Sequence, residues 1–154
     1  MRMDSKTYRR AAGGRGVFRL VIVGLALFLV SQASAGVVVV VAPDSDLDSL
    51  TQAQVKSLFL GKVKSLPNGQ TAVPVNQAES SPVYDAFNNK ILGKSSAKIL
   101  QYWASRVFSG KGSPPEVVPD DKAVIEFVKS KKGAIGYIDS ASADGSVKVI
   151  YSSD

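Results

Sequence analysis

Apolar residues form several short runs that predict strands. Residues 37–42 (VVVVVA) are β-branched and apolar without alternation, which is typical of a strand covered on both faces. Shorter runs with many Val, Ile or Tyr residues predict further strands at 71–75, 133–138 and 147–151. Pro74 has no N–H to donate, so the strand that contains it is expected at a sheet edge or a crossing point.

Apolar residues at three- and four-residue spacing predict four helices, each preceded by a residue that caps helix N-termini. We expect one helix at about 52–60, capped by Ser49 or Thr51, and a second from Pro82 to about 92, preceded by Ser80-Ser81. A third helix is expected to begin at Ser95 or Ser96 and to end at about 108, and a fourth is expected to be capped by Asp120 or Asp121 and to end at about 130. Their expected inward residues are Val55, Leu58 and Phe59; Val83, Phe87 and Ile91; Ile99, Trp103 and Val107; and Val124, Phe127 and Val128. Residues 110–119 are rich in Gly and Pro and predict a loop. This order of elements predicts a single α/β sandwich.

The first 35 residues have the layout of a secretory signal peptide. A basic start precedes the apolar run at 20–30, and Ala33-Ser34-Ala35 supplies small side chains for cleavage. The run would rise only ~16 Å as a helix, against a bilayer core of ~30 Å. We therefore predict cleavage after Ala35, export to the periplasm, and one domain over residues 36–154. The alternative is an uncleaved anchor over residues 20–42, because hydrophobicity resumes at Val37.

The charge of +6 belongs almost entirely to this leader. Residues 1–35 contain six basic residues and one acidic residue, whereas the rest of the chain contains thirteen and twelve. Nucleic-acid binding requires clustered positive charge that displaces counterions from phosphates. The sequence shows no basic stripe with interleaved aromatic residues, so a nucleic-acid partner is not expected.

The chain contains neither Cys nor His, which excludes disulfides, zinc sites of the usual type and the common nucleophile–base pairs. We therefore predict no enzymatic activity and no cofactor. Asp44, Asp46 and Asp48 alternate as Ca²⁺ ligands can, but the glycine and glutamate of a calcium loop do not follow. We therefore expect them to solvate a loop and predict no metal site.

Ser80 and Ser81 are the first candidate binding residues. A helix N-terminus presents free N–H groups and a positive dipole to an anion, and Ser80-Ser81 directly precede Pro82 at a predicted helix start. Ordinary serine capping is the alternative, and Pro82 removes one donor from the first turn. The local pattern leaves both interpretations open.

Several segments, taken in order, resemble the exported phosphate-binding components of ABC transporters. They are SLTQAQVKSLFLGK (49–62), AVPVNQ (72–77), SSPVYDAF (80–87), YW (102–103) and GAIGYI (133–138). The chain is most similar to the short, one-lobed members of this family. The resemblance implies a single-lobe type II periplasmic-binding-protein fold, which is a three-layer α/β sandwich with a mixed central sheet. It also implies phosphate or another small oxyanion as ligand, and a membrane transporter or sensor as partner.

The ligand turn of that family usually reads Ser-Gly-Thr-Arg before its helix. Aligned on Phe87, this chain has Ser81, Pro82, Val83 and Tyr84, so only the serine matches. An arginine makes two charge-assisted bonds to an oxyanion, and tyrosine lacks the charge to replace it.

Two hypotheses follow from this comparison. The first is a degenerate oxyanion site, in which the remaining donors are the hydroxyls of Ser80 and Ser81 and the N–H groups of Val83 and Tyr84. The second is an interaction or sensory accessory module without a small ligand. It is motivated by the missing arginine and by the absence of a counterpart to the phosphate loop of the family's N-terminal lobe.

Overall fold

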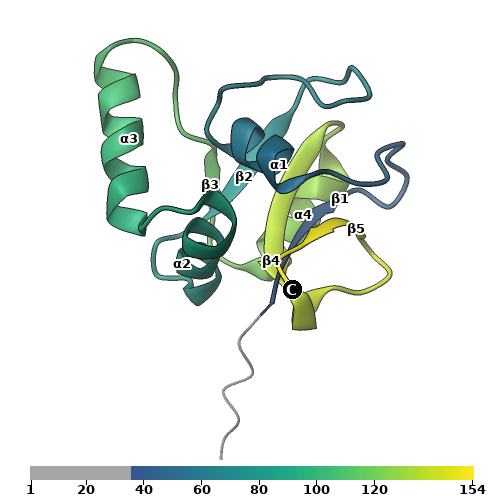
Figure 1. Ribbon diagram of the computed structural model, residues 1–154. Helices are drawn as coiled ribbons and strands as arrows, with labels where there is room; N and C mark the ends of the chain where they lie inside the picture. The colour runs from purple at the N-terminus through teal and green to yellow at the C-terminus, as the bar shows by residue number, and fades with distance from the viewer. Residues whose placement is uncertain (1–35) are drawn as a thin grey trace, which may run out of the picture. The chain divides into compact units, whose positions relative to one another are not determined.

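A computed structural model describes residues 36–154 (Figure 1). The predicted signal peptide, residues 1–35, lies outside the described residues. The strands are β1 (Val37–Val41), β2 (Val73–Gln77), β3 (Glu116–Val118), β4 (Ala134–Asp139) and β5 (Lys148–Ser152). The helices are α1 (Gln52–Phe59), α2 (Pro82–Phe87), α3 (Ser96–Phe108) and α4 (Asp121–Ser130), with a π-helix η1 (Asn88–Leu92) and a 3₁₀ turn η2 (Ser140–Ser142).

β1 is buried on both faces, as its unbroken run of valines predicts. Val37, Val39 and Val41 belong to one hydrophobic core, and Val38 and Val40 belong to the other, because successive side chains of a strand point to opposite faces. Residues 37–41 therefore lie inside a folded sheet and are not available for an anchor that extends to residue 42. Within residues 36–154, no helix has the length and apolar character needed to cross a bilayer.

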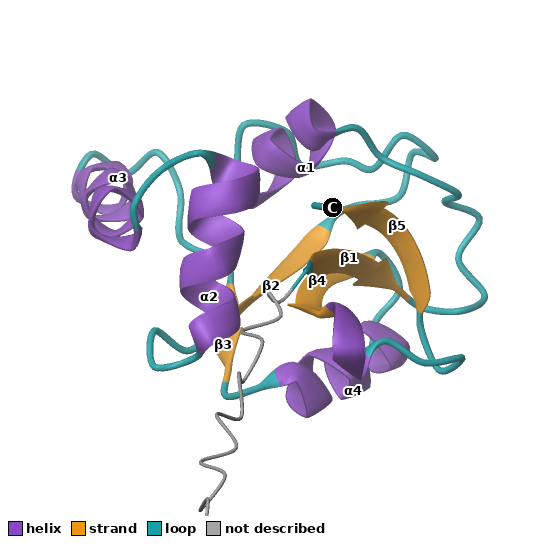
Figure 2. Ribbon diagram, turned by 60° about the horizontal axis from the view of Figure 1, so that its bottom comes forward, coloured by secondary structure: helices purple, strands orange, loops and turns teal. Residues whose placement is uncertain are grey.

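The five strands form one mixed sheet in the order β3-β2-β4-β1-β5. β2 pairs in parallel with both β3 and β4, whereas β1 pairs antiparallel with β4 and β5. α1 and α2 cover one face and α4 covers the other (Figure 2). This arrangement confirms the three-layer α/β sandwich with a mixed central sheet. Both cores are built from residues between Val37 and Ile150.

β2 lies two residues later than predicted, and one strand was missed. β4 pairs with Val73 and Pro74, whereas β3 pairs only from Val75 onward, so Pro74 stands where the strand changes neighbours. β3 lies inside the predicted 110–119 loop. Its three residues at the sheet edge follow a Pro-rich stretch and are too few for a period-two pattern to be recognised.

The helix caps agree with the sequence. Thr51 forms a capping box with Gln54 at α1, and Ser81, Ser95 and Asp120 cap the other three helices through their side chains. The helix predicted to continue to Leu92 instead changes to the π-helix η1 after Phe87, and it ends at Gly93 in a left-handed conformation.

α3 differs from the prediction on one side. Ile99 and Trp103 are buried as expected, but Val107 is 54% exposed. α3 lies at the periphery in both ribbon views, and Trp103 packs beside Gly61 on the loop after α1. Only one narrow face of the helix therefore contacts the body of the domain. The four-residue spacing of Ile99, Trp103 and Val107 identified an apolar stripe. It did not show that the body of the domain covers only Ile99 and Trp103.

Candidate functional site

The candidate site lies at the carboxyl ends of the three parallel strands, which meet along the same edge of the sheet. β2 ends at Gln77, opposite Val118 of β3, and β4 ends at Asp139. The chain leaves β2 for α2 on one face and β3 for α4 on the other, so the first turns of both helices meet at this edge. In open α/β sheets, ligands bind outside the carboxyl ends of parallel strands, where successive connections go to opposite faces.

A hollow of about 530 Å³ lies at this edge. Of the predicted site residues, Ser81 and Val83 line it, while Ser80 and Tyr84 do not. Ser80 is exposed at the turn, and Tyr84 is buried in the domain. The other lining residues are Gln77, Pro82, Asp120, Asp121, Lys122, Asp139, Ala141 and Ser142. Three carboxylates and one lysine therefore surround the hollow.

Three of the four predicted donors at the start of α2 already have partners within the chain. The hydroxyl of Ser81 donates to Oε1 of Gln77 at 2.6 Å and accepts the N–H of Val83 at 3.2 Å. The N–H of Tyr84 donates to the Ser81 carbonyl at 3.1 Å. Each of these bonds would have to be exchanged if an anion were to use the same donor.

Gln77 is the central polar residue of the site, and sequence analysis missed it. Its side chain is 1% exposed. Its amide nitrogen Nε2 donates to Oδ1 of Asp121 at 2.7 Å and to the Tyr137 carbonyl at 2.9 Å. With the bond from Ser81 to its oxygen, the side-chain amide is fully satisfied, as buried polar groups generally are. The available signal was the polar pair Asn76-Gln77 directly after the predicted apolar strand, with Gln77 four residues before a capping serine.

Asp121 occupies the position that suits an anion. It is the first residue of α4, where the helix dipole favours negative charge. Its carboxylate accepts hydrogen bonds from Gln77, from the hydroxyl of Ser142 at 2.6 Å and from the N–H of Asp139 at 3.2 Å. An amide, a hydroxyl and a backbone N–H from the end of β4, together beside the N-terminus of α4, form a donor set of the kind that binds an oxyanion. The chain fills this donor set with its own carboxylate.

Tyr137 supports the site from inside the core. Its ring stacks on Phe87 with centroids 3.8 Å apart. Its hydroxyl donates to Oδ1 of Asn76 and accepts the N–H of Gln77 at 3.1 Å. Burial raises the pKa of Tyr137 well above its ordinary value, so the phenol stays neutral and holds the end of β2 in place.

Asp48 and the Tyr102-Trp103 segment make structural contacts. Asp48 forms an ion pair with Lys148 at 2.8 Å, and this lysine lowers the pKa of the Asp48 carboxyl through a hydrogen bond and its charge. Tyr102 donates its hydroxyl to the Leu60 carbonyl, and Trp103 is buried in the core. Residues 36–154 contain no group of three acidic side chains that could hold a metal ion.

Comparison with known proteins identifies the fold. No protein-family model matches the chain, and no curated protein sequence matches it either. Among solved structures, an ABC-type phosphate transport receptor from Vibrio cholerae superimposes with a TM-score of 0.60 at 21% identity, over 75% of this chain and 45% of the receptor. PstS from Borrelia burgdorferi does so with a TM-score of 0.55 at 14% identity, over 75% of this chain and 47% of that protein.

The chain spans less than half the length of these two proteins, as expected for a single lobe. The resemblance inferred from the sequence motifs is therefore confirmed at the level of the fold. Residues 36–154 have the fold of part of a phosphate ABC transporter substrate-binding protein.

Proposed function

We propose that residues 36–154 form an exported, binding-protein-like domain related to phosphate uptake, whose oxyanion site is degenerate. The observation that supports this is the carboxylate of Asp121, which accepts three hydrogen bonds at the strand ends where an oxyanion would be bound. Ser81 remains from the family's ligand turn, but its hydroxyl is bonded to Gln77 and Val83. Free phosphate would bind with a dissociation constant of about 1 mM or weaker.

The physical reason is competition between an internal anion and a free one. A phosphate that entered the hollow would have to displace the Asp121 carboxylate from its donors and then remain beside it. Asp120 and Asp139 also line the hollow, against the single cation Lys122. Two unit charges about 4 Å apart near a protein surface repel by several kcal/mol, which is enough to remove useful affinity.

Replacing Asp121 with Asn is expected to raise phosphate affinity about tenfold, because the change removes one negative charge and keeps the shape of the side chain. Phosphate titration followed by calorimetry and by the amide NMR shifts of Asp139 and Ser142 measures the effect. Asp44→Asn is the matched control, since Asp44 is an exposed aspartate that does not line this hollow. It should leave the affinity unchanged.

Two results would contradict the degenerate site. Submicromolar phosphate binding by the wild-type protein would require ligand groups beyond those described above. No response in either the wild type or Asp121→Asn, with the fold intact, would instead favour a domain without a small ligand.

The second candidate function is that of an interaction or sensory accessory module that contacts a membrane transporter or a sensor. One observation favours it: the donors of the strand-end site are bonded within the chain. Either function requires export.

Export itself predicts that mass spectrometry of the secreted protein will find Gly36 as the N-terminal residue. The small side chains of Ala33 and Ala35 suit the cleavage pocket. A membrane-bound product that retains Met1 would contradict cleavage.

A further inference from the structure

The outer face of α3 carries an uncovered apolar stripe. Five residues at three- and four-residue spacing share this face, and all of them are exposed: Ala97, Leu100, Ala104, Val107 and Phe108, hereafter the α3 stripe. Phe108 is 95% exposed at the end of the helix. A surface helix normally turns such a stripe toward the protein core. Here the core-facing side of α3 is a different one, formed by Ile99 and Trp103.

The sequence around the α3 stripe is basic. Residues 86–115 contain four lysines and one arginine but no acidic residue, and Asp85, just before this range, accepts a hydrogen bond from Ser96 at the start of α3. The two ion pairs within residues 36–154 use Lys131 and Lys148, so Lys94, Lys98 and Lys111 take part in neither. Arg106 is held by the rings of Tyr102 and Trp103 and by its bond to the Lys111 carbonyl. The available positive charge therefore lies at both ends of α3.

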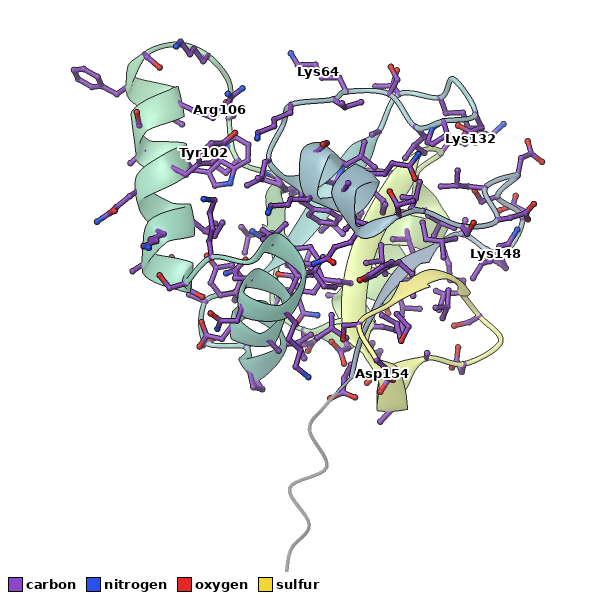
Figure 3. The ribbon with its side chains drawn as sticks, viewed as in Figure 1. Lys64, Tyr102, Arg106, Lys132, Lys148 and Asp154 are labelled. Atoms are coloured by element: carbon purple, nitrogen blue, oxygen red, sulfur yellow. The ribbon has the colours of Figure 1, made fainter. Side chains whose placement is uncertain are left out.

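Basic and acidic residues are also unevenly distributed along the described part of the chain. Residues 49–115 contain eight basic and two acidic residues, whereas the other described residues contain five and ten. Lys56 on α1 approaches Gly93 just before α3. Helix α1 therefore adds one lysine beside the start of α3. Figure 3 shows Tyr102 and Arg106 on α3, and Lys132 and Lys148 on the opposite side of the domain. The net charge of the domain conceals this asymmetry.

The size and charge of the α3 stripe indicate what covers it. A helix of 13 residues is about 20 Å long and 10 Å wide, so the stripe covers only about 200 Å² in projection. A stable protein interface needs about 800 Å² from each partner. Two copies meeting through α3 would also bring lysines against lysines. A convex apolar ridge flanked by lysines instead suits an anionic lipid surface, where the apolar side chains enter the acyl boundary and each lysine adds attraction.

We propose that the α3 stripe, with Lys98 and Lys111 beside it, docks this domain on an anionic phospholipid surface. Phe108 enters the interfacial region first because it is the most exposed apolar side chain of the stripe. The lysines lay their alkyl stems along the helix and keep their ammonium groups at the level of the lipid phosphates. This contact is separate from the strand-end site and does not depend on phosphate binding.

The test uses residues 36–154 and vesicles of phosphatidylcholine alone or mixed equally with phosphatidylglycerol. Trp103 is the only tryptophan of the chain and lies on α3, so energy transfer from it to a dansyl-labelled lipid reports docking. We expect binding to the mixed vesicles that weakens as salt is added, and at least about tenfold weaker binding to phosphatidylcholine alone. Phe108→Ser should lower the partition coefficient about tenfold, and Lys98→Glu with Lys111→Glu should lower it by about a hundredfold or more.

Matched controls come from elsewhere on the domain. Val117→Ser removes an exposed apolar side chain from β3, and Lys132→Glu reverses an exposed charge far from α3. Both should bind vesicles as the parent does. Thermal unfolding verifies that each variant is folded.

Three results would overturn the proposal. They are no binding to the mixed vesicles, equal binding to both kinds of vesicle, or unchanged binding by the α3 variants. A concentration-dependent dimer that Phe108→Ser abolishes, without vesicle binding, would assign the α3 stripe to a second copy of the chain instead.

Discussion

Replacing Val39 with Asp is expected to unfold residues 36–154 at room temperature. Val39 is 0% exposed and lies in the interior strand β1, paired with Tyr137 on β4 and Tyr151 on β5. Its side chain belongs to the core that α1 and α2 cover. The residues of this core are all hydrophobic, so the introduced carboxylate would have no cation beside it. A buried, unpaired charge costs several kcal/mol, against a total stability of ~5–15 kcal/mol for a domain of this size. Urea unfolding followed by circular dichroism measures the loss.

Val149→Asp is the matched control for this prediction. Val149 is also a strand valine, on β5, but its side chain is 43% exposed. The same substitution there should cost about 1 kcal/mol or less, because the carboxylate stays in water. If Val39→Asp unfolds at the same urea concentration as Val149→Asp, the two-sided burial of β1 is wrong.

Gly133→Ala is expected to destabilise the domain by about 3 kcal/mol or more. Gly133 has a φ of +77° just before β4, a conformation that costs an L-residue about 1–2 kcal/mol. A Cβ at this position would also lie 2.1 Å from the Thr71 carbonyl oxygen. The contact is backbone against backbone, so β4 and the residues before β2 would have to separate, which adds the cost of overpacking.

Gly69→Ala separates the two contributions. Gly69 has a similar φ of +84°, but a Cβ there would meet no atom within 4 Å. It should therefore lose only the conformational part, about 1–2 kcal/mol. Equal losses for Gly133→Ala and Gly69→Ala, measured by urea unfolding, would show that β2 and β4 do not approach as described.

Much of the local structure could be predicted because neighbouring residues determine it. The unbroken valines of β1, the caps Thr51, Ser81 and Asp120, and the buried positions of α4 follow from periodicity and from side-chain bonds over two or three residues. β3 could not be predicted in this way. Its pairing partner is β2, about forty residues earlier in the chain, and three residues carry too little pattern of their own.

The candidate site was predicted in part. The sequence indicated the start of α2 and the Ser81 hydroxyl, and the structure brings Ser81 to the strand ends. It did not indicate Gln77 or Asp121, which are 44 residues apart. In the sequence, nothing distinguishes Asp121 from an ordinary acidic residue in the first turn of a helix. Its position at an oxyanion-type donor set appears only when β2, β4 and α4 are assembled.

The sequence by itself determined the fold class and the positions of most elements. These properties depend on residue type and on local spacing. The tertiary structure alone decided which carboxylate fills the strand-end site and which face of α3 stays in water. Both depend on contacts between segments far apart in the chain, which local hydrophobic patterns do not encode. The same apolar spacing on α3 produced a buried Trp103 and an exposed Val107, because the body of the domain covers only one side of that helix.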